Sequence, residues 1–123
     1  MLDVSKDKAS RLITTKCIGE LTQADLEGYI QTNWTDEESN FNELFIVLNV
    51  QTSIDFKTML EHSIRAVDYN LGSTISPRTA IVATEPNVRD LAAFYRATQS
   101  LKSVREVELF ETEEQARAWL AET

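Results

Sequence analysis

Two uninterrupted apolar runs constrain the fold of this 123-residue chain more than any other feature. They are "LFIVLNV" at residues 44–50 and "RTAIVAT" at residues 78–84. A strand covered by helices on both faces carries apolar side chains at nearly every position, whereas a half-exposed strand alternates. The runs therefore predict two central strands of a parallel sheet.

The rest of the chain alternates between strand and helix patterns. The predicted order is strands at 2–6 and 11–19, a helix at 21–34, the strand at 44–50, a helix at 53–72, the strand at 78–84, a helix from Pro86, a strand at 104–110 and a helix from Thr112. This order predicts one α/β domain over residues 1–123, with a leading antiparallel strand followed by four β-α units. The sheet should be five-stranded and mainly parallel, with the helices packed on it.

Two helix starts have clear capping signals. Thr22 is followed three residues later by Asp25, and Thr112 is followed three residues later by Gln115. Such pairs satisfy the free N–H groups of a first helical turn. In the last helix, Ala116, Trp119 and Leu120 share one face and are expected to cover the sheet.

The helix at 53–72 has an apolar stripe at helical spacing, formed by Phe56, Met59, Leu60, Ile64 and Val67. We expect this stripe to face the sheet and Gly72 to close the helix.

His62, the only histidine, then falls on the opposite face. It is either a general base or pH sensor, or a solvated surface residue. Because no nucleophile is paired with it in the sequence, the surface interpretation is preferred. Cys17, within a strand, is expected to be a buried small apolar residue rather than a reactive thiol.

The helix from Pro86 has apolar residues on two sides. Val88, Ala92 and Tyr95 set the core stripe together with Leu91, whereas Phe94 lies off that stripe, and Leu91 and Leu101 extend the second side. This second side is either buried against a neighbouring helix or forms a dimer or apolar-ligand surface. Trp34, at the end of the first helix, has the same two interpretations.

Most of the net charge of −8 comes from a single segment of the chain. Residues 20–43 contain seven carboxylates and no Lys or Arg. The chain therefore lacks the basic footprint of a nucleic-acid-binding protein. Anionic lipid should repel it unless apolar contacts compensate, so that membrane contact is at most peripheral. The acidic segment is expected to be a solvated face, with a basic partner as the alternative.

Several classes of site have no signal in the sequence. The three glycines are far apart, the acidic loop does not follow a calcium-binding pattern, and there is one Cys and one His. We expect no catalytic residues, no metal and no cofactor. A single cysteine, no apolar run of about 20 residues and no signal-peptide pattern at residues 1–10 predict a cytoplasmic location.

Three stretches resemble motifs of one known family, in the right order along nearly the whole chain. They are "IGELTQADLEGY", "RTAIVAT" and the most specific, "VELFETEEQARAWL". They are similar to "G-x-L-T-x-x-D", "R-x-A-(V/I)-V" and "V-x-x-F-x-x-x-E-x-A-x-x-W-L" of the SpoIIAA-like proteins. This family is a branch of the STAS-type superfamily and is similar to lipid-binding CRAL-TRIO domains.

The resemblance implies a leading strand, four β-α units and often a homodimer, with apolar-ligand binding or membrane association suggested. Related anti-sigma-factor antagonists are switched by phosphorylation of a serine in a "D-S-x-G" motif at the start of the helix after the central strand. Here that region reads "LNVQTSIDFKTML". Ser53 and Thr58 are nearby hydroxyls, but neither lies in "D-S-x-G".

Three hypotheses follow. The first is a non-enzymatic binding module that forms a homodimer. Phe94 and Leu101 would lie at its dimer surface, or at a surface that binds an apolar small molecule or a protein partner. The second is a regulator phosphorylated at Ser53 or Thr58. The third is an enzyme whose groups converge from distant parts of the sequence.

Overall fold

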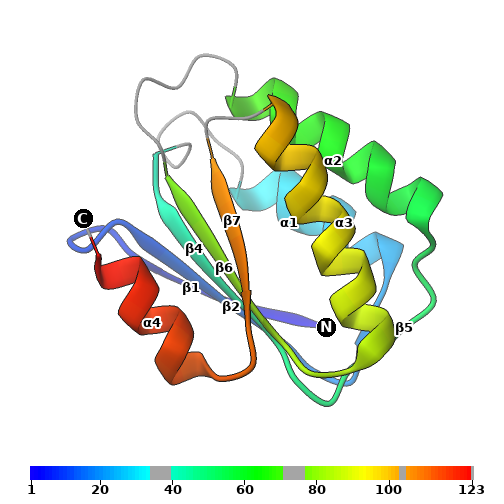
Figure 1. Cartoon of the computed structure of the whole chain (residues 1–123), viewed down its shortest axis with the longest axis horizontal. Helices are drawn as coiled ribbons and strands as arrows, with labels where there is room; N and C mark the ends of the chain where they lie inside the picture. The colour runs from blue at the N-terminus through cyan, green and yellow to red at the C-terminus, as the bar shows by residue number, and fades with distance from the viewer. Residues whose placement is uncertain (34–39, 71–76, 103–104, 123) are drawn as a thin grey trace.

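The two apolar runs form the central strands of a mixed sheet (Figure 1). The computed structural model describes residues 1–33, 40–70, 77–102 and 105–122. Its elements are β1 (Leu2–Asp7), β2 (Leu12–Cys17), β3 (Glu20–Leu21), α1 (Gln23–Asn33), β4 (Asn42–Val47), β5 (Gln51–Thr52), α2 (Phe56–Asn70), β6 (Arg78–Ala83), α3 (Pro86–Lys102), β7 (Glu106–Phe110) and α4 (Glu113–Ala121).

The main sheet has the order β1-β2-β4-β6-β7. β1 pairs with β2 antiparallel, and the pairs from β2 to β7 are parallel. The predicted five-stranded, mainly parallel sheet with a leading antiparallel edge strand is therefore confirmed. β7, which has Glu106 and Glu108 on one face, is the other edge, as its charge pattern predicted.

Helices cover both faces of the sheet. Figure 1 shows α1, α2 and α3 on one side and α4 on the other. Side chains along β4 and β6 alternate between the two layers: Val47 and Ile81 pack under α2 and α3, whereas Leu44 and Val82 pack under α4. Because both faces are covered, the two strands carry apolar side chains at nearly every position.

The capping signals are confirmed. Thr112 caps α4 by accepting a hydrogen bond from the Gln115 N–H at 3.2 Å. Ala116 and Leu120 are buried on the sheet. On the outer side, Arg117 pairs with Glu113 at 2.7 Å.

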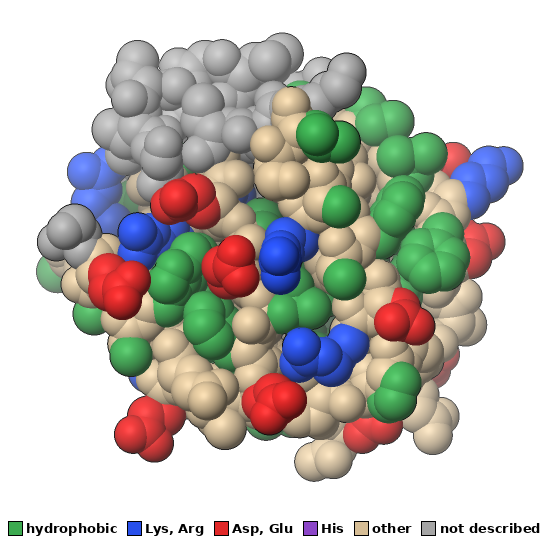
Figure 2. Space-filling model, viewed as in Figure 1, with side chains coloured by type: hydrophobic (Ala, Val, Ile, Leu, Met, Phe, Trp, Pro, Cys, Tyr) green, Lys and Arg blue, Asp and Glu red, His purple; other side chains and the backbone are tan. Residues whose placement is uncertain are grey.

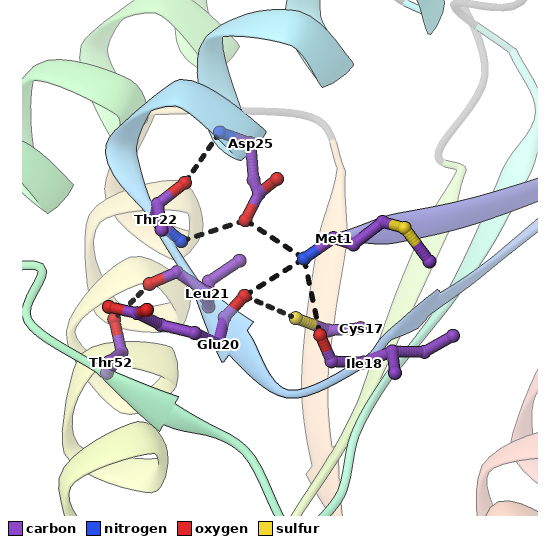
Figure 3. A network of polar contacts seen from close by, with 8 residues as sticks. All are labelled: Met1, Cys17, Ile18, Glu20, Leu21, Thr22, Asp25 and Thr52. Carbon is purple, nitrogen blue, oxygen red and sulfur yellow. Dashed lines mark hydrogen bonds and ion pairs between the residues drawn. The ribbon is translucent and has the colours of Figure 1, made fainter.

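A reciprocal pair begins α1 (Figure 3). The Thr22 N–H donates to Asp25 Oδ2 at 3.0 Å, and the Asp25 N–H donates to Thr22 Oγ1 at 3.1 Å. The amino group of Met1 also reaches Asp25 Oδ2 at 3.4 Å. Burial raises the pKa of Asp25, but the hydrogen bonds from Thr22 and the charge of the amino group outweigh it, and the net pKa is lowered.

One small element was not expected. β3 and β5 form a separate two-stranded parallel sheet beside the start of α1. Gly19, with a φ of +81°, turns the chain from β2 into β3, a backbone conformation that glycine adopts without strain. The Thr52 hydroxyl donates to the Leu21 carbonyl at 2.8 Å and joins the segment before α2 to the segment before α1.

Candidate functional site

A cavity of about 80 Å³ lies between the sheet and helices α1, α2 and α3. Its walls are mainly aliphatic and aromatic side chains from these elements. The polar side chains in the lining are those of Tyr29, Glu43, His62, Thr79 and Tyr95. The cavity is thus apolar, with hydrogen-bonding groups on part of its wall.

Glu43 is the centre of a buried polar cluster beside this cavity. Its carboxylate accepts hydrogen bonds from the Tyr29 hydroxyl and, at 2.9 Å, from the Thr79 hydroxyl. The Arg105 guanidinium lies 3.2 Å from Glu43 Oε1. Arg105 also donates to Thr79 Oγ1 at 3.1 Å and to the Phe41 carbonyl at 3.2 Å. The four side chains of this cluster, those of Tyr29, Glu43, Thr79 and Arg105, are buried. The ion pair between Glu43 and Arg105 is therefore almost completely removed from water.

This cluster corrects one expectation from the sequence. Glu43 was counted with the acidic segment expected to be solvated, but it is 6 % exposed and paired with Arg105. A charged residue directly before an apolar strand was the available signal. Arg105, 62 residues later, could not be matched to it without the fold.

His62 lies on the inner side of α2, not on the solvated face. It lines the cavity, with its ring 5.5 Å from the ring of Tyr95. Burial lowers the pKa of His62 to about 4, outweighing the nearby carboxylates of Glu43 and Glu27 that favour its protonated form. The preferred interpretation of His62 as a solvated surface residue was therefore wrong, and its imidazole is neutral at pH 7.

The two tyrosines also remain protonated. Burial, followed by the charge of Glu43, raises the pKa of Tyr29 and that of Tyr95. Both hydroxyls can therefore donate a hydrogen bond at neutral pH.

The apolar stripe expected to bury α2 does so only in part: Met59 is buried and Val67 is half-buried, but the other three residues face outward. Phe56, Leu60 and Ile64 are 54 %, 42 % and 51 % exposed. The inner face carries Met59 and two small residues, Ser63 and Ala66.

Small residues explain why the large ones do not point inward. Ser63 is fully buried, and its hydroxyl donates a hydrogen bond to the Met59 carbonyl at 2.8 Å. Its own carbonyl accepts a hydrogen bond from Gln99 Nε2 of α3 at 2.9 Å. Short side chains on the inner face let α3 approach α2 closely. The apolar periodicity of the sequence does not reveal such a need for small residues.

The residues predicted for a dimer or ligand surface separate in space. Leu101 is 81 % exposed. Phe94 is half-buried and lies edge-on to Phe56, with the two ring centroids 5.4 Å apart. Leu91 does not share their surface: it is buried in the core and lines the cavity. Trp34 lies outside the described residues.

Phe94 and Leu101 join the outward residues of α2 in one surface. The Phe56–Phe94 ring contact and the Ser63–Gln99 hydrogen bond show that α2 and α3 run side by side in the same direction. The same offset brings Ile64 level with Leu101. We call Phe56, Leu60, Ile64, Phe94 and Leu101 the α2–α3 face, and Figure 2 shows hydrophobic side chains gathered along α2.

The predicted phosphoacceptors lie at the start of α2. Ser53 is exposed, whereas Thr58 is half-buried. Asp55 occupies the helix N-terminus and accepts the Thr58 N–H at 2.8 Å, and this hydrogen bond lowers the pKa of Asp55. Ser53 shares a shallow hollow of about 250 Å³ with Asp55 and with Asp90 of α3. A phosphate on Ser53 would therefore meet two carboxylates.

Cys17 is buried, as expected, and burial raises the pKa of its thiol. Among the residues that the structure describes, no three His, Cys, Asp or Glu side chains gather as metal ligands do. None of the helices in the described ranges has the length and apolar character needed to cross a bilayer.

Removing Arg105 should expose how much the buried pair depends on both partners. We expect Arg105→Met to lower the free energy of unfolding by about 3–5 kcal/mol, because it leaves the Glu43 carboxylate buried without its counter-charge. Arg117→Met is the control, since it breaks an exposed pair worth less than about 1 kcal/mol. Urea unfolding measures both. An equal, small loss in the two variants would contradict the role assigned to the cluster.

The lowered pKa of His62 predicts a specific dependence of stability on pH. Between about pH 6.5 and pH 4, His62 is protonated in the unfolded chain but not in the folded chain, so unfolding takes up a proton. The free energy of unfolding therefore decreases as the pH is lowered through this range. The loss from pH 7 to pH 4 should be about 3 kcal/mol larger in the wild type than in His62→Gln. Urea unfolding at both pH values measures it, and parallel losses would show that His62 is solvated.

Comparison with known proteins shows the fold. The sequence matches no protein-family model and no curated protein. A solved structure of an uncharacterized protein from the DUF3478 family, from Shewanella loihica PV-4, is similar over 98 % of this chain and 93 % of that chain, with a TM-score of 0.56 and 15 % identity. That protein has a SpoIIAA-like fold. The chain described here therefore has a SpoIIAA-like fold, as its motifs predicted.

Proposed function

We propose that the protein is a non-enzymatic binding module that pairs with a second copy of itself through the α2–α3 face. The observation that carries this proposal is the exposure of Phe56, Leu60, Ile64 and Leu101 on two adjacent helices. Single exposed apolar residues are ordinary, but a contiguous apolar patch on a small protein commonly marks an interface.

The α2–α3 face has the features of a contact between identical copies. The exposed Lys57 and Glu61 lie beside its apolar side chains on α2, one turn apart. A two-fold contact requires a self-complementary patch. If two α2 helices cross antiparallel near Leu60, each Lys57 approaches the Glu61 of the other copy. Opposite charges on the rim then favour this orientation.

The cavity of about 80 Å³ does not support the alternative in which the module carries a large apolar ligand in its interior. Pockets for drug-sized ligands enclose about 300–1,000 Å³, and an acyl chain needs comparable room. The α2–α3 face, rather than the interior, is thus the better surface for a large apolar partner.

A phosphorylation switch is the alternative that the family resemblance offers. Ser53 is exposed and precedes α2. However, Asp55 already fills the helix N-terminus, and Asp90 adds a second negative charge to the hollow. These carboxylates would oppose a phosphate, so this alternative ranks below pairing through the α2–α3 face.

The pairing proposal is tested by placing a charge in the centre of the α2–α3 face. Leu60→Glu should leave the fold intact and weaken self-association at least tenfold, because a carboxylate would be buried in an apolar contact. Ile18→Glu is the matched control, since Ile18 is also exposed but lies on another part of the molecule. Sedimentation equilibrium measures both.

A wild type that stays monomeric at every concentration, or an equal effect of the two substitutions, would reject pairing through this face. In the first case, binding of the wild type to anionic or neutral vesicles, abolished by Leu60→Glu, would identify a membrane as the occupant instead.

A further inference from the structure

The cavity under α1, α2 and α3 is not used by the proposed pairing, and its lining has a definite chemistry. We propose that it binds a small neutral molecule with an apolar body of a few non-hydrogen atoms and one hydroxyl or amide group. This inference is independent of the proposed function, because the α2–α3 face lies on the outer side of the same helices.

The volume of the cavity sets the size of the ligand. An apolar cavity of about 150 Å³ in another protein accommodates benzene. The cavity here measures about 80 Å³, so it admits a smaller body and excludes an acyl chain. A ligand of about four non-hydrogen atoms fits this space.

The polar part of the wall sets the ligand's functional group. The Tyr29 hydroxyl is already engaged, because it donates to Glu43. Tyr95 adds a second hydroxyl, and the neutral imidazole of His62 has one donor and one acceptor nitrogen. A hydroxyl or amide, which donates and accepts, is complementary to these groups.

The charge balance of the wall excludes ionic ligands. The carboxylate of Glu43 is compensated by Arg105, at 3.2 Å, before any ligand arrives. The imidazole of His62 and both phenols are uncharged at neutral pH. An ion entering this cavity would lose its hydration and meet no uncompensated counter-charge, so it should bind much more weakly than a neutral molecule.

Three probes matched in size test this proposal: 1-propanol, propionate and propylammonium. Each is titrated into the wild type and followed by NMR of backbone amides and of the Met59 methyl group, which lies in the wall. We expect 1-propanol to cause saturable shifts confined to cavity residues. The two ions should bind at least tenfold more weakly. No saturable shift with 1-propanol, or equal binding of the ions, would overturn the proposal.

Two neighbouring alanines of α3 provide a matched pair of variants. Ala92 is buried in the cavity wall, whereas Ala93 is exposed. Ala92→Leu adds roughly the volume of three methylene groups to the cavity and should abolish 1-propanol binding. Ala93→Leu adds the same atoms outside and should leave binding unchanged. Equal binding by the two variants would overturn the assignment of the site.

A milder variant covers the case in which Ala92→Leu fails to fold. Tyr95→Phe removes one hydroxyl from the wall and keeps the ring that contacts His62. It should weaken 1-propanol binding about threefold to tenfold, the ordinary contribution of one hydrogen bond. Unchanged affinity would overturn the role of the polar wall, whatever happens to Ala92→Leu.

Discussion

The ion pair between Glu43 and Arg105 is the interaction on which the α1–α3 side of the structure depends. It joins β4 to the residue directly before β7, and through Tyr29 and Thr79 it also holds α1 and β6. An isolated charge at this depth would be strongly unfavourable, so each group requires the other and their hydrogen-bonding neighbours. With the pair satisfied, the rest of the space under the three helices can remain apolar and partly empty.

The helix α2 separates two environments. Its inner face carries Met59 and His62 to the cavity and Ser63 to α3, while its outer face presents Leu60 and Ile64 to solvent. This arrangement inverts the usual expectation that the largest apolar side chains of a helix cover the sheet. Small inner residues allow close packing of α3, and the large outer ones remain exposed. The surface proposed for pairing and the cavity are therefore on opposite sides of one helix.

Most of the fold could be predicted because its signals are local. The doubly buried runs of β4 and β6 and the capping pairs at Thr22 and Thr112 each depend on a few consecutive residues. The order of these patterns predicted the α/β sheet, and the solved structure with a SpoIIAA-like fold agrees with the resemblance of the motifs.

The candidate site could be predicted only in part, because its contacts are not local. Phe94 and Leu101 were identified by their distance from the core stripe, but the neighbours that complete their surface lie on α2, whose orientation the periodicity misassigned. His62 was misplaced by the same rotation of that helix. Pairing Glu43 with Arg105 required knowing that β4 and β7 lie in one sheet and begin at the same end of it.

Native mass spectrometry of the protein as purified distinguishes pairing from the carriage of a large ligand, because one spectrum reports both the number of subunits and any retained molecule. We expect a dimer without a lipid-sized adduct, since the α2–α3 face is exposed and apolar and the cavity of about 80 Å³ is too small for an acyl chain. A monomer at all concentrations, or a subunit that carries a lipid-sized adduct, would contradict this expectation.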